Sequence, residues 1–352
     1  MTPVYPYLVA GAFKIFGIYT KASALVLLSL NALMSACTGI PLFFIARKSF
    51  GERAARWTAW AWAVFPYGIY FPMERIWETW LSTLLLSLLF LFGLYLEDST
   101  SLRTWAGWGA LWGFAALVSP AVLAVLPFCG LWIVYRRYQK GLKFIPHVVL
   151  ASLLFIAVVS PWFIRNYNVF HRFIPFRDNM GIVLLTGTRG NSDYWGPHEF
   201  GPWHNDFEWG EFKRLGEFEY MAAKKRYAIE FIRNNPGWYV WTTARRAVFI
   251  WTGYWSLERS YLQQEPLDPP NIFFSTTFTL LTLLGLRKAF RLGAATAMPY
   301  FFVLFFFPLI YYITVPEMYY RRPLDPIMLV LAVYAVMGWG SRKEPLQPEA
   351  AP

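Results

Sequence analysis

The sequence has few charged residues and almost no cysteine. Only 15% of its 352 residues are charged, whereas a soluble domain carries about 25%, so an ordinary soluble protein is excluded. The two cysteines, Cys37 and Cys129, both lie inside apolar runs, so neither a disulfide framework nor a cysteine metal cluster can be argued. The first residues show no positively charged region followed by a cleavage site, and no signal peptide is predicted.

Hydrophobic residues are what the sequence has in abundance. They make up 57% of the chain, and the mean hydropathy is +0.35, which indicates a polytopic membrane protein. Aromatic residues reach 20%, including 18 tryptophans, as expected where rings anchor helices at the headgroup level. The net charge of +11 does not indicate a nucleic-acid partner, because the cations lie in short loops between apolar runs.

Nine apolar runs have roughly the length of a membrane span. They are residues 22–46, 54–72, 77–96, 104–119, 120–135, 146–164, 272–290, 294–315 and 324–341. Residues 3–19 are shorter and rich in glycine, which favours a helix in the membrane interface. The sequence thus predicts an all-α polytopic membrane protein with about nine transmembrane helices, interfacial helices and a small external helical segment.

The loop cations predict an orientation. Basic clusters follow the first, fifth, seventh and last runs, and alternate counting places all of them on one side, which we take as cytoplasmic. This puts residues 165–271 on the non-cytoplasmic side. It also starts the chain outside the cytoplasm, which favours a missing N-terminal helix. The predicted parts are 1–164, an N-terminal transmembrane bundle with an interfacial helix at 1–20; 165–271, an external segment; and 272–352, C-terminal transmembrane helices with a short cytoplasmic tail.

The external segment has its own pattern. Residues 181–210 are rich in Gly, Asn, Asp and aromatics, which predicts an irregular loop. Residues 211–233 place apolar side chains at helical spacing, and Asn235-Pro236-Gly237 predicts the end of that helix. Residues 238–255 are apolar but carry Arg245 and Arg246, which favours a surface-lying or shallowly inserted helix over a span.

Three motifs in this order, PWFIRNYNVFHRFIPF, NNPGWYVWTTARRAVFIW and YYRRPLDPIMLVLAVYAV, resemble the bacterial C-type (GT-C) glycosyltransferases, in the protein O-mannosyltransferase and aminoarabinose-transferase-like branch. The resemblance covers nearly the whole chain. It implies an enzyme of the bacterial plasma (inner) membrane that takes a sugar from a polyprenyl-phosphate donor. The sugar would pass to a lipid, glycan or protein acceptor on the non-cytoplasmic face, among membrane lipids.

The chain departs from this family at one point. The family's acidic motif lies in the external loop between its first two spans, and here no Asp or Glu precedes Glu52. Either the chain continues upstream of Met1, or this form is inactive. A catalytically inactive relative that serves as a membrane scaffold therefore stays an alternative. A transporter is a weaker one, because no internal repeat of two related halves is visible.

Inverting transfer from a phosphate-linked sugar needs a carboxylate to deprotonate the acceptor. Glu74, Arg75 and Glu78 lie in a predicted outer loop. Glu78 is the preferred catalytic residue, since it lies deeper than Glu74. An interfacial charge cluster that pairs internally would have the same composition, although a charge within the membrane is usually functional.

The reaction also needs cations to hold the departing lipid phosphate. Arg165, at the end of an apolar helix starting near residue 146, is the first candidate; Arg321, Arg322 and Arg75 are the others, because the guanidinium fork suits phosphate. We expect Glu78, Arg165 and Arg321 or Arg322 to floor one cavity roofed by the external segment. Arg165 could instead snorkel to ordinary lipid headgroups. Arg245 and Arg246 are weaker phosphate candidates, because a surface-lying basic helix attracts anionic lipid in any case. Asp325 could cap the last helix.

The sequence specifies no cofactor. Histidines and carboxylates of the external segment could hold a divalent cation, but their spacing matches no reliable motif and loop histidines are usually solvated. These residues are His171, His198, His204, Asp193, Glu199 and Asp206.

Overall fold

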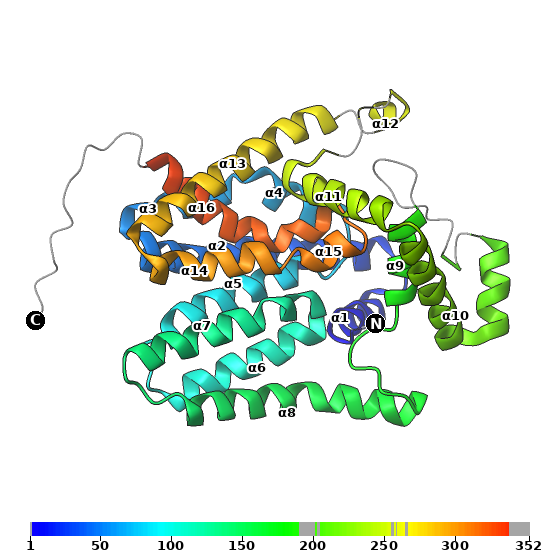
Figure 1. Cartoon of the computed structure of the whole chain (residues 1–352), viewed down its shortest axis with the longest axis horizontal. Coiled ribbons are helices and arrows are strands. Elements are labelled where there is room, and N and C mark those ends of the chain that lie inside the picture. Colours follow the sequence, from blue (N-terminus) through cyan, green and yellow to red (C-terminus); the bar gives the residue numbers. More distant parts are fainter. Residues whose placement is uncertain are drawn as a thin grey trace, which may run out of the picture.

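The computed structural model describes residues 2–189, 201–202, 205–254, 257, 259–264 and 267–337. Within these ranges the chain forms helices and no strand, which confirms the all-α class. Long helices run side by side, and α9 and α10 lie at one end of them (Figure 1). The elements are α1 (Val4–Phe16), α2 (Lys21–Phe50), α3 (Glu52–Ala63), α4 (Pro66–Glu74), α5 (Thr79–Leu96), α6 (Leu102–Val118), the 3₁₀ helix η1 (Pro120–Ala124), α7 (Leu126–Gln139), α8 (Ile145–Phe170), α9 (Met180–Arg189), α10 (Asp206–Asn234), α11 (Pro236–Thr252), α12 (Arg259–Gln264), α13 (Asp268–Leu292), α14 (Ala294–Phe306), α15 (Leu309–Ile313), the 3₁₀ helix η3 (Met318–Leu324) and α16 (Asp325–Met337).

Four helical stretches in the described part of the chain are long and apolar enough to cross a membrane. They are α2, α5, α8 and the stretch Ala294–Ile313, which contains α14 and α15. These apolar helices make the chain a multi-pass membrane protein. The predicted count of about nine spans is not confirmed, because α6 has 17 residues, α7 has 14 and α16 has 13. That count stays a prediction.

The predicted span 54–72 is divided in the structure. Helix α3 ends at Ala63, and α4 begins at Pro66. Proline at the first helical position is favourable, but the residue before it is kept out of the helical region. Phe65 accordingly has an extended backbone, with φ −70° and ψ 116°. A window of hydropathy does not register this local break.

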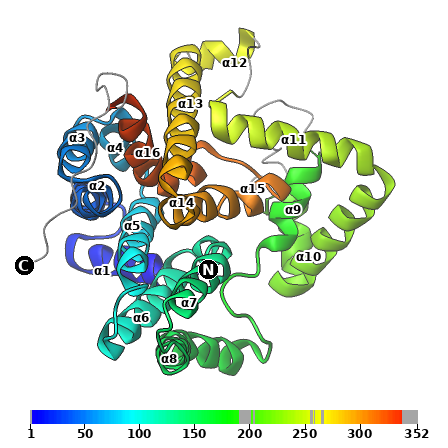
Figure 2. The same ribbon diagram turned by 60° about the vertical axis from the view of Figure 1, so that its left-hand side comes forward.

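Close packing of α6 against α8 holds one side of the bundle together. Gly109 lies at the contact, and a Cβ atom at this position would overlap the carbonyl oxygen of Ala151. Small residues let helix backbones approach closely, which supplies packing energy where apolar lipid gives no hydrophobic drive. Seen turned by 60°, α6 and α8 lie on the side of the molecule opposite α13 (Figure 2).

The 165–271 segment differs from its prediction in three places. Helix α8 continues past Arg165 to Phe170. The predicted loop 181–210 is wrong at both ends, because α9 occupies 180–189 and α10 starts at Asp206. Ile182 and Leu185 are buried, and α9 packs on α10, so burial makes this glycine-containing stretch helical. Gly216, with φ 74°, then breaks α10, a conformation that glycine adopts without strain.

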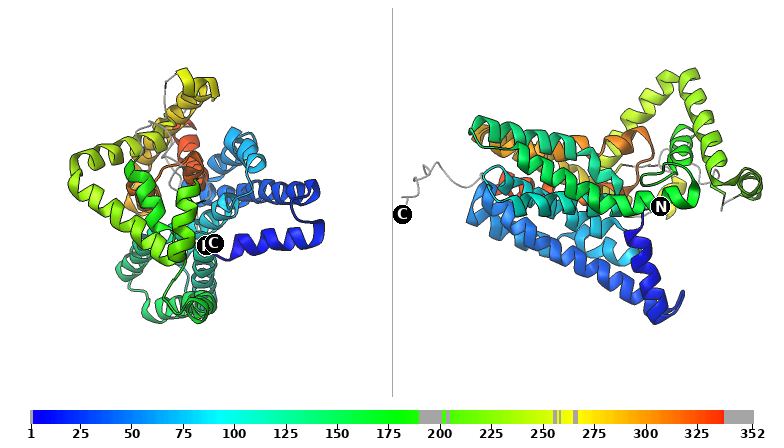
Figure 3. Two further views of the ribbon diagram at one scale, coloured as in Figure 1. Left: turned by 90° about the vertical axis from the view of Figure 1, so that its right-hand side faces the viewer. Right: turned by 90° about the horizontal axis from the view of Figure 1, so that it is seen from below.

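Two other predicted helices agree with the structure in position. The amphipathic run 211–233 lies within α10, and residues 238–255 correspond largely to α11. The predicted N-terminal helix is α1, which stands at an angle to the long helices (Figure 3). With 13 residues, α1 is short for a span, and its interfacial position stays a prediction.

Candidate functional site

A cavity of about 440 Å³ lies between the bundle and the start of the 165–271 segment. We call it the Glu78 cavity. Its walls come from the start of α5, the turn Ser119-Pro120 with η1, the loop after α8, the start of α9, α15 and η3. Tyr311 and Tyr320 line it and stack on each other with ring centroids 4.5 Å apart. The cavity therefore combines an aromatic wall with a charged one.

The charged wall is an ion pair between Glu78 and Arg177. Arg177 donates a short hydrogen bond to the Glu78 carboxylate and a second one of 3.1 Å to the Thr2 hydroxyl. Thr2 in turn donates to the carbonyl oxygen of Val118 at 2.9 Å. The Glu78 side chain is 13% exposed and that of Arg177 29%, so the pair is reachable from the cavity but shielded from bulk solvent.

The local backbone structure positions both Glu78 and Arg177 at the cavity. Glu78 immediately precedes α5 and makes no capping bond with its side chain, which leaves the carboxylate near the positive end of the helix dipole. Arg177 lies in the loop that leads from α8 to α9, and its Nε is buried without a hydrogen-bond acceptor among the described residues. One donor of Arg177 is thus buried without a partner among the described residues.

Sequence reasoning did not single out Arg177. It stands in the same stretch as Arg165, but nothing local distinguishes it from the other loop cations. The pair with Glu78 joins residues 99 positions apart, and only the tertiary structure brings them together. The one available signal for Arg177 was its position in a loop directly before a helix. That helix, α9, was missed because residues 181–210 were predicted to be a loop.

Arg165 lines a second cavity, of about 420 Å³, which we call the Arg165 cavity. Its guanidinium lies over the rings of Trp162, at 5.0 Å, and Phe170, at 5.4 Å, and donates to the Asn166 side chain at 3.1 Å. No carboxylate lies within ion-pair distance of Arg165 among the described residues. Arg165 is exposed and is the cation best placed to take an anion from outside.

The two cavities adjoin. Phe176 lines both of them, and the polar residues Asp178 and Glu217 line the Arg165 cavity. Burial raises the pKa of Asp178, and the negative charge of Glu217 raises it further. The arrangement places an exposed arginine and a carboxylate with a raised pKa on one side of Phe176, and the Arg177–Glu78 pair on the other.

Glu74 and Arg75 lie at neither cavity wall among the described lining residues. Arg75 forms an ion pair with Glu317 at 3.6 Å and covers the ring of Tyr319 at 4.3 Å. Burial raises the pKa of Glu317, and Arg75 opposes that shift. Glu74 accepts a hydrogen bond from Tyr319. Glu74 and Arg75 thus both contact residues at the start of η3.

Arg321 and Arg322 are buried, each 3% exposed. Both pair with Asp325, at 3.3 Å and 2.8 Å, and Arg322 lies over the Tyr67 ring at 3.8 Å. Arg321 also donates to two carbonyl oxygens of α11 and to the Ser275 hydroxyl. These bonds connect α4, α11, α13 and α16. Neither arginine is among the residues lining the two cavities, so the expected single floor of Glu78, Arg165 and Arg321 or Arg322 is not formed.

The remaining cations have structural partners. Arg246 is buried and donates to the carbonyl oxygens of Gly187 and Tyr312, and Arg245 lies over the Phe249 ring at 5.5 Å. Asp325 pairs with two arginines, which goes beyond the capping role predicted for it.

A divalent cation finds no ready site in the described residues, which contain no group of three or more His, Cys, Asp or Glu side chains that could hold one. His171 and Asp206 are described, but four of the predicted ligands lie outside the described residues. These four are Asp193, His198, Glu199 and His204.

Comparisons with known proteins show what this chain is similar to. The family model "Dolichyl-phosphate-mannose-protein mannosyltransferase" matches residues 1–164. The oligosaccharyltransferase of Archaeoglobus fulgidus, crystallised with Zn and sulfate, is similar in structure, with a TM-score of 0.50 and 13% identity over 96% of this chain. This chain spans 40% of that protein's length. The partial family match and the similar fold both agree with the resemblance to the C-type membrane glycosyltransferases.

A second solved structure is ArnT from Cupriavidus metallidurans bound to undecaprenyl phosphate. It shares 13% identity over 95% of this chain and 67% of its own length, with a TM-score of 0.35. No curated protein sequence matches the chain.

Proposed function

We propose that this protein is a glycosyltransferase of the bacterial plasma membrane. It would move a sugar from a polyprenyl-phosphate donor to an acceptor hydroxyl at the non-cytoplasmic end of the bundle. The observation that carries the proposal is the Glu78–Arg177 pair in the wall of a cavity of about 440 Å³. The C-type glycosyltransferase fold supports it independently.

Glu78 serves as the general base. Its carboxylate takes the proton of the acceptor hydroxyl as the oxygen attacks the anomeric carbon and the bond to the carrier phosphate breaks. A carboxylate held by a guanidinium is a weaker base, so the pair has to loosen before transfer. The donor phosphate does this by competing for the Arg177 guanidinium, since that side chain is 29% exposed.

Arg177 and Arg165 share the phosphate charge in this proposal. Arg177 would contact the phosphate in the Glu78 cavity, and Arg165 would attract it from the adjoining cavity, where it has no carboxylate partner among the described residues. Donors aimed at developing charge in a site shielded from water stabilise the transition state strongly. Arg75, Arg321 and Arg322, already paired with carboxylates, would hold the framework.

The test is transfer of labelled sugar from a panel of polyprenyl-phosphate donors by the full chain in lipid nanodiscs. Glu78→Gln should lower turnover by roughly 100-fold or more, the usual contribution of a general base. Glu52→Gln, which alters an exposed pair with Arg47, should leave turnover unchanged. If the wild-type protein transfers sugar from none of the donors, or if Glu78→Gln turns over as fast as wild type, the proposal fails and the membrane-scaffold alternative is favoured.

A further inference from the structure

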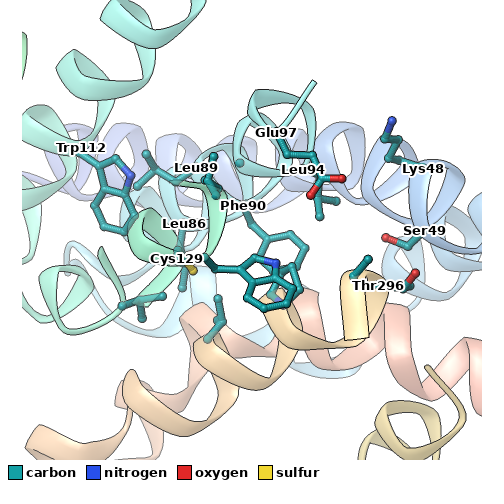
Figure 4. Close-up of a pocket in the computed structure, with 17 residues that line it drawn as sticks. Lys48, Ser49, Leu86, Leu89, Phe90, Leu94, Glu97, Trp112, Cys129 and Thr296 are labelled. Atoms are coloured by element: carbon teal, nitrogen blue, oxygen red, sulfur yellow. The ribbon is translucent and has the colours of Figure 1, made fainter. Parts of the chain in front are cut away.

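A third cavity lies at the other end of the bundle, away from the Glu78 cavity. Figure 4 shows its lining side chains, from α2, α5, α6, α7 and α14. We call it the Trp112 cavity; its volume is about 150 Å³. It follows α5 from Leu86 to Glu97, a length of about 16 Å at 1.5 Å per residue. A cavity of this volume holds about one benzene-sized apolar group, so it takes a segment of one extended chain and no bulkier group.

Its walls are apolar for most of that length. They consist of Leu86, Leu89, Phe90, Leu94, Ile133 and Val303. Helices α5 and α14, which supply most of these residues, belong to the stretches apolar enough to cross a membrane. A lipid chain is therefore the apolar molecule available at this position.

Trp112 and Trp132 both line the cavity, and their indole N–H groups are buried without a hydrogen-bond acceptor among the described residues. By contrast, Trp108 on the same face donates to a carbonyl oxygen of α5 at 3.3 Å. Trp112, 3% exposed, closes the inner end and meets the Trp108 ring edge to face at 5.9 Å. Trp132 lies one turn before Arg136, about 6 Å along the axis, where the ester of a lipid anchored at the rim would lie.

The rim carries an excess of positive charge. Lys48 lines the opening with a side chain that is 40% exposed, and Glu97 lines it from α5. Arg136 and Lys140 pair with Glu97 at 3.3 Å and 2.8 Å, and Lys140 and Lys48 reach Asp98. Three cations thus face two carboxylates, which favours an anionic headgroup. The sequence predicts the cytoplasm at this same end.

We propose that the Trp112 cavity binds one acyl chain of an anionic phospholipid. A segment of the chain lies in the cavity along α5, the Trp132 side chain turns so that its N–H donates to the ester carbonyl, and the headgroup phosphate lies at Lys48. This site is separate from the Glu78 cavity and does not depend on the proposed function.

The structure offers a matched pair of variants. Gly93 lines the cavity, and a Cβ atom there would meet only Ile133, at an ordinary 3.8 Å. Gly93→Leu therefore fills the channel, whereas Gly93→Ala leaves most of it open. Trp132→Phe keeps the ring and removes the N–H donor.

The experiment titrates delipidated full-length protein with phosphatidylglycerol and, separately, phosphatidylcholine, and counts bound lipids by native mass spectrometry. Wild type and Gly93→Ala should retain one phosphatidylglycerol at low lipid, and Gly93→Leu should lose it. Trp132→Phe should bind it roughly three- to tenfold more weakly, the value of one hydrogen bond. Three results would overturn the proposal: Gly93→Leu retains as much phosphatidylglycerol as wild type, wild type retains none, or wild type retains both lipids equally. If Gly93→Leu does not fold, an unchanged affinity of Trp132→Phe overturns it alone.

Discussion

The Glu78–Arg177 pair makes a sharp prediction about stability. Arg177→Met leaves the Glu78 carboxylate, 13% exposed, without its charged partner. Removing one partner of a fully buried pair costs about 3–5 kcal/mol, and a hydrogen bond to a charged group is worth about 1.5–3 kcal/mol. Because Arg177 is 29% exposed, solvent screens part of the interaction, and we expect a loss of about 2 kcal/mol.

A double-mutant cycle isolates the interaction. Glu78→Gln removes the charge and keeps an oxygen acceptor, so the double variant should be more stable than the sum of the two single changes predicts. The expected coupling energy is about 1 kcal/mol or more. Thermal unfolding of the protein in detergent at a fixed scan rate measures it, with about 1–2 °C expected per kcal/mol for a chain of this length.

The chain supplies its own control for this cycle. Arg172 and Glu219 form a pair of 3.1 Å nearby, but both side chains are more than half exposed. Such a pair contributes about 0–1 kcal/mol, so Arg172→Met should change the melting temperature little. If Arg177→Met and Arg172→Met behave alike, or if Glu78→Gln and Arg177→Met are additive, the pair does not hold the loop on α5 and our reasoning fails.

Two further predictions concern packing and pH. Gly109→Ala should destabilise the bundle by about 3 kcal/mol, because its Cβ would overlap a backbone carbonyl of α8 and overpacking usually costs about 1–3 kcal/mol. The control is Gly107→Ala, because no atom lies within 4 Å of a Cβ at that position. Equal melting temperatures of the two variants would contradict the close packing of α6 on α8. The raised pKa of Asp178 means that its contribution to stability is present at low pH and is lost as pH rises through the folded-state value. Asp178→Asn should therefore melt at a higher temperature than wild type above about pH 4, with the difference vanishing in acid; a constant difference across the pH range would exclude this origin.

The sequence predicted helices best where one unbroken helix contains the whole apolar run. Apolar runs of spanning length appear as α2, α5 and α8, because hydropathy depends on neighbouring residues alone. The run 54–72 failed, since a proline and its preceding residue break the backbone without lowering hydropathy. The loop prediction for 181–210 failed because α9 is stabilised by burial against α10, which no local property of a glycine-containing segment records.

The structure brings together only some of the residues that the sequence suggested for one site. Glu78 and Arg165 each line a cavity, and the two cavities adjoin. Arg321 and Arg322 look like free cations in the sequence, yet the structure buries them against Asp325. A charged residue near a helix end has the same local pattern whether it faces a ligand or a buried carboxylate, so sequence alone cannot separate these outcomes.

The sequence by itself determined that this is an all-helical, multi-pass membrane protein resembling C-type glycosyltransferases. Composition and motif order carry that information, because the energy of placing residues in lipid is nearly additive along the chain. Only the tertiary structure decided which arginine meets Glu78. Arg177 reaches it across 99 positions of sequence, and the distance between two side chains so far apart depends on the packing of every helix between them.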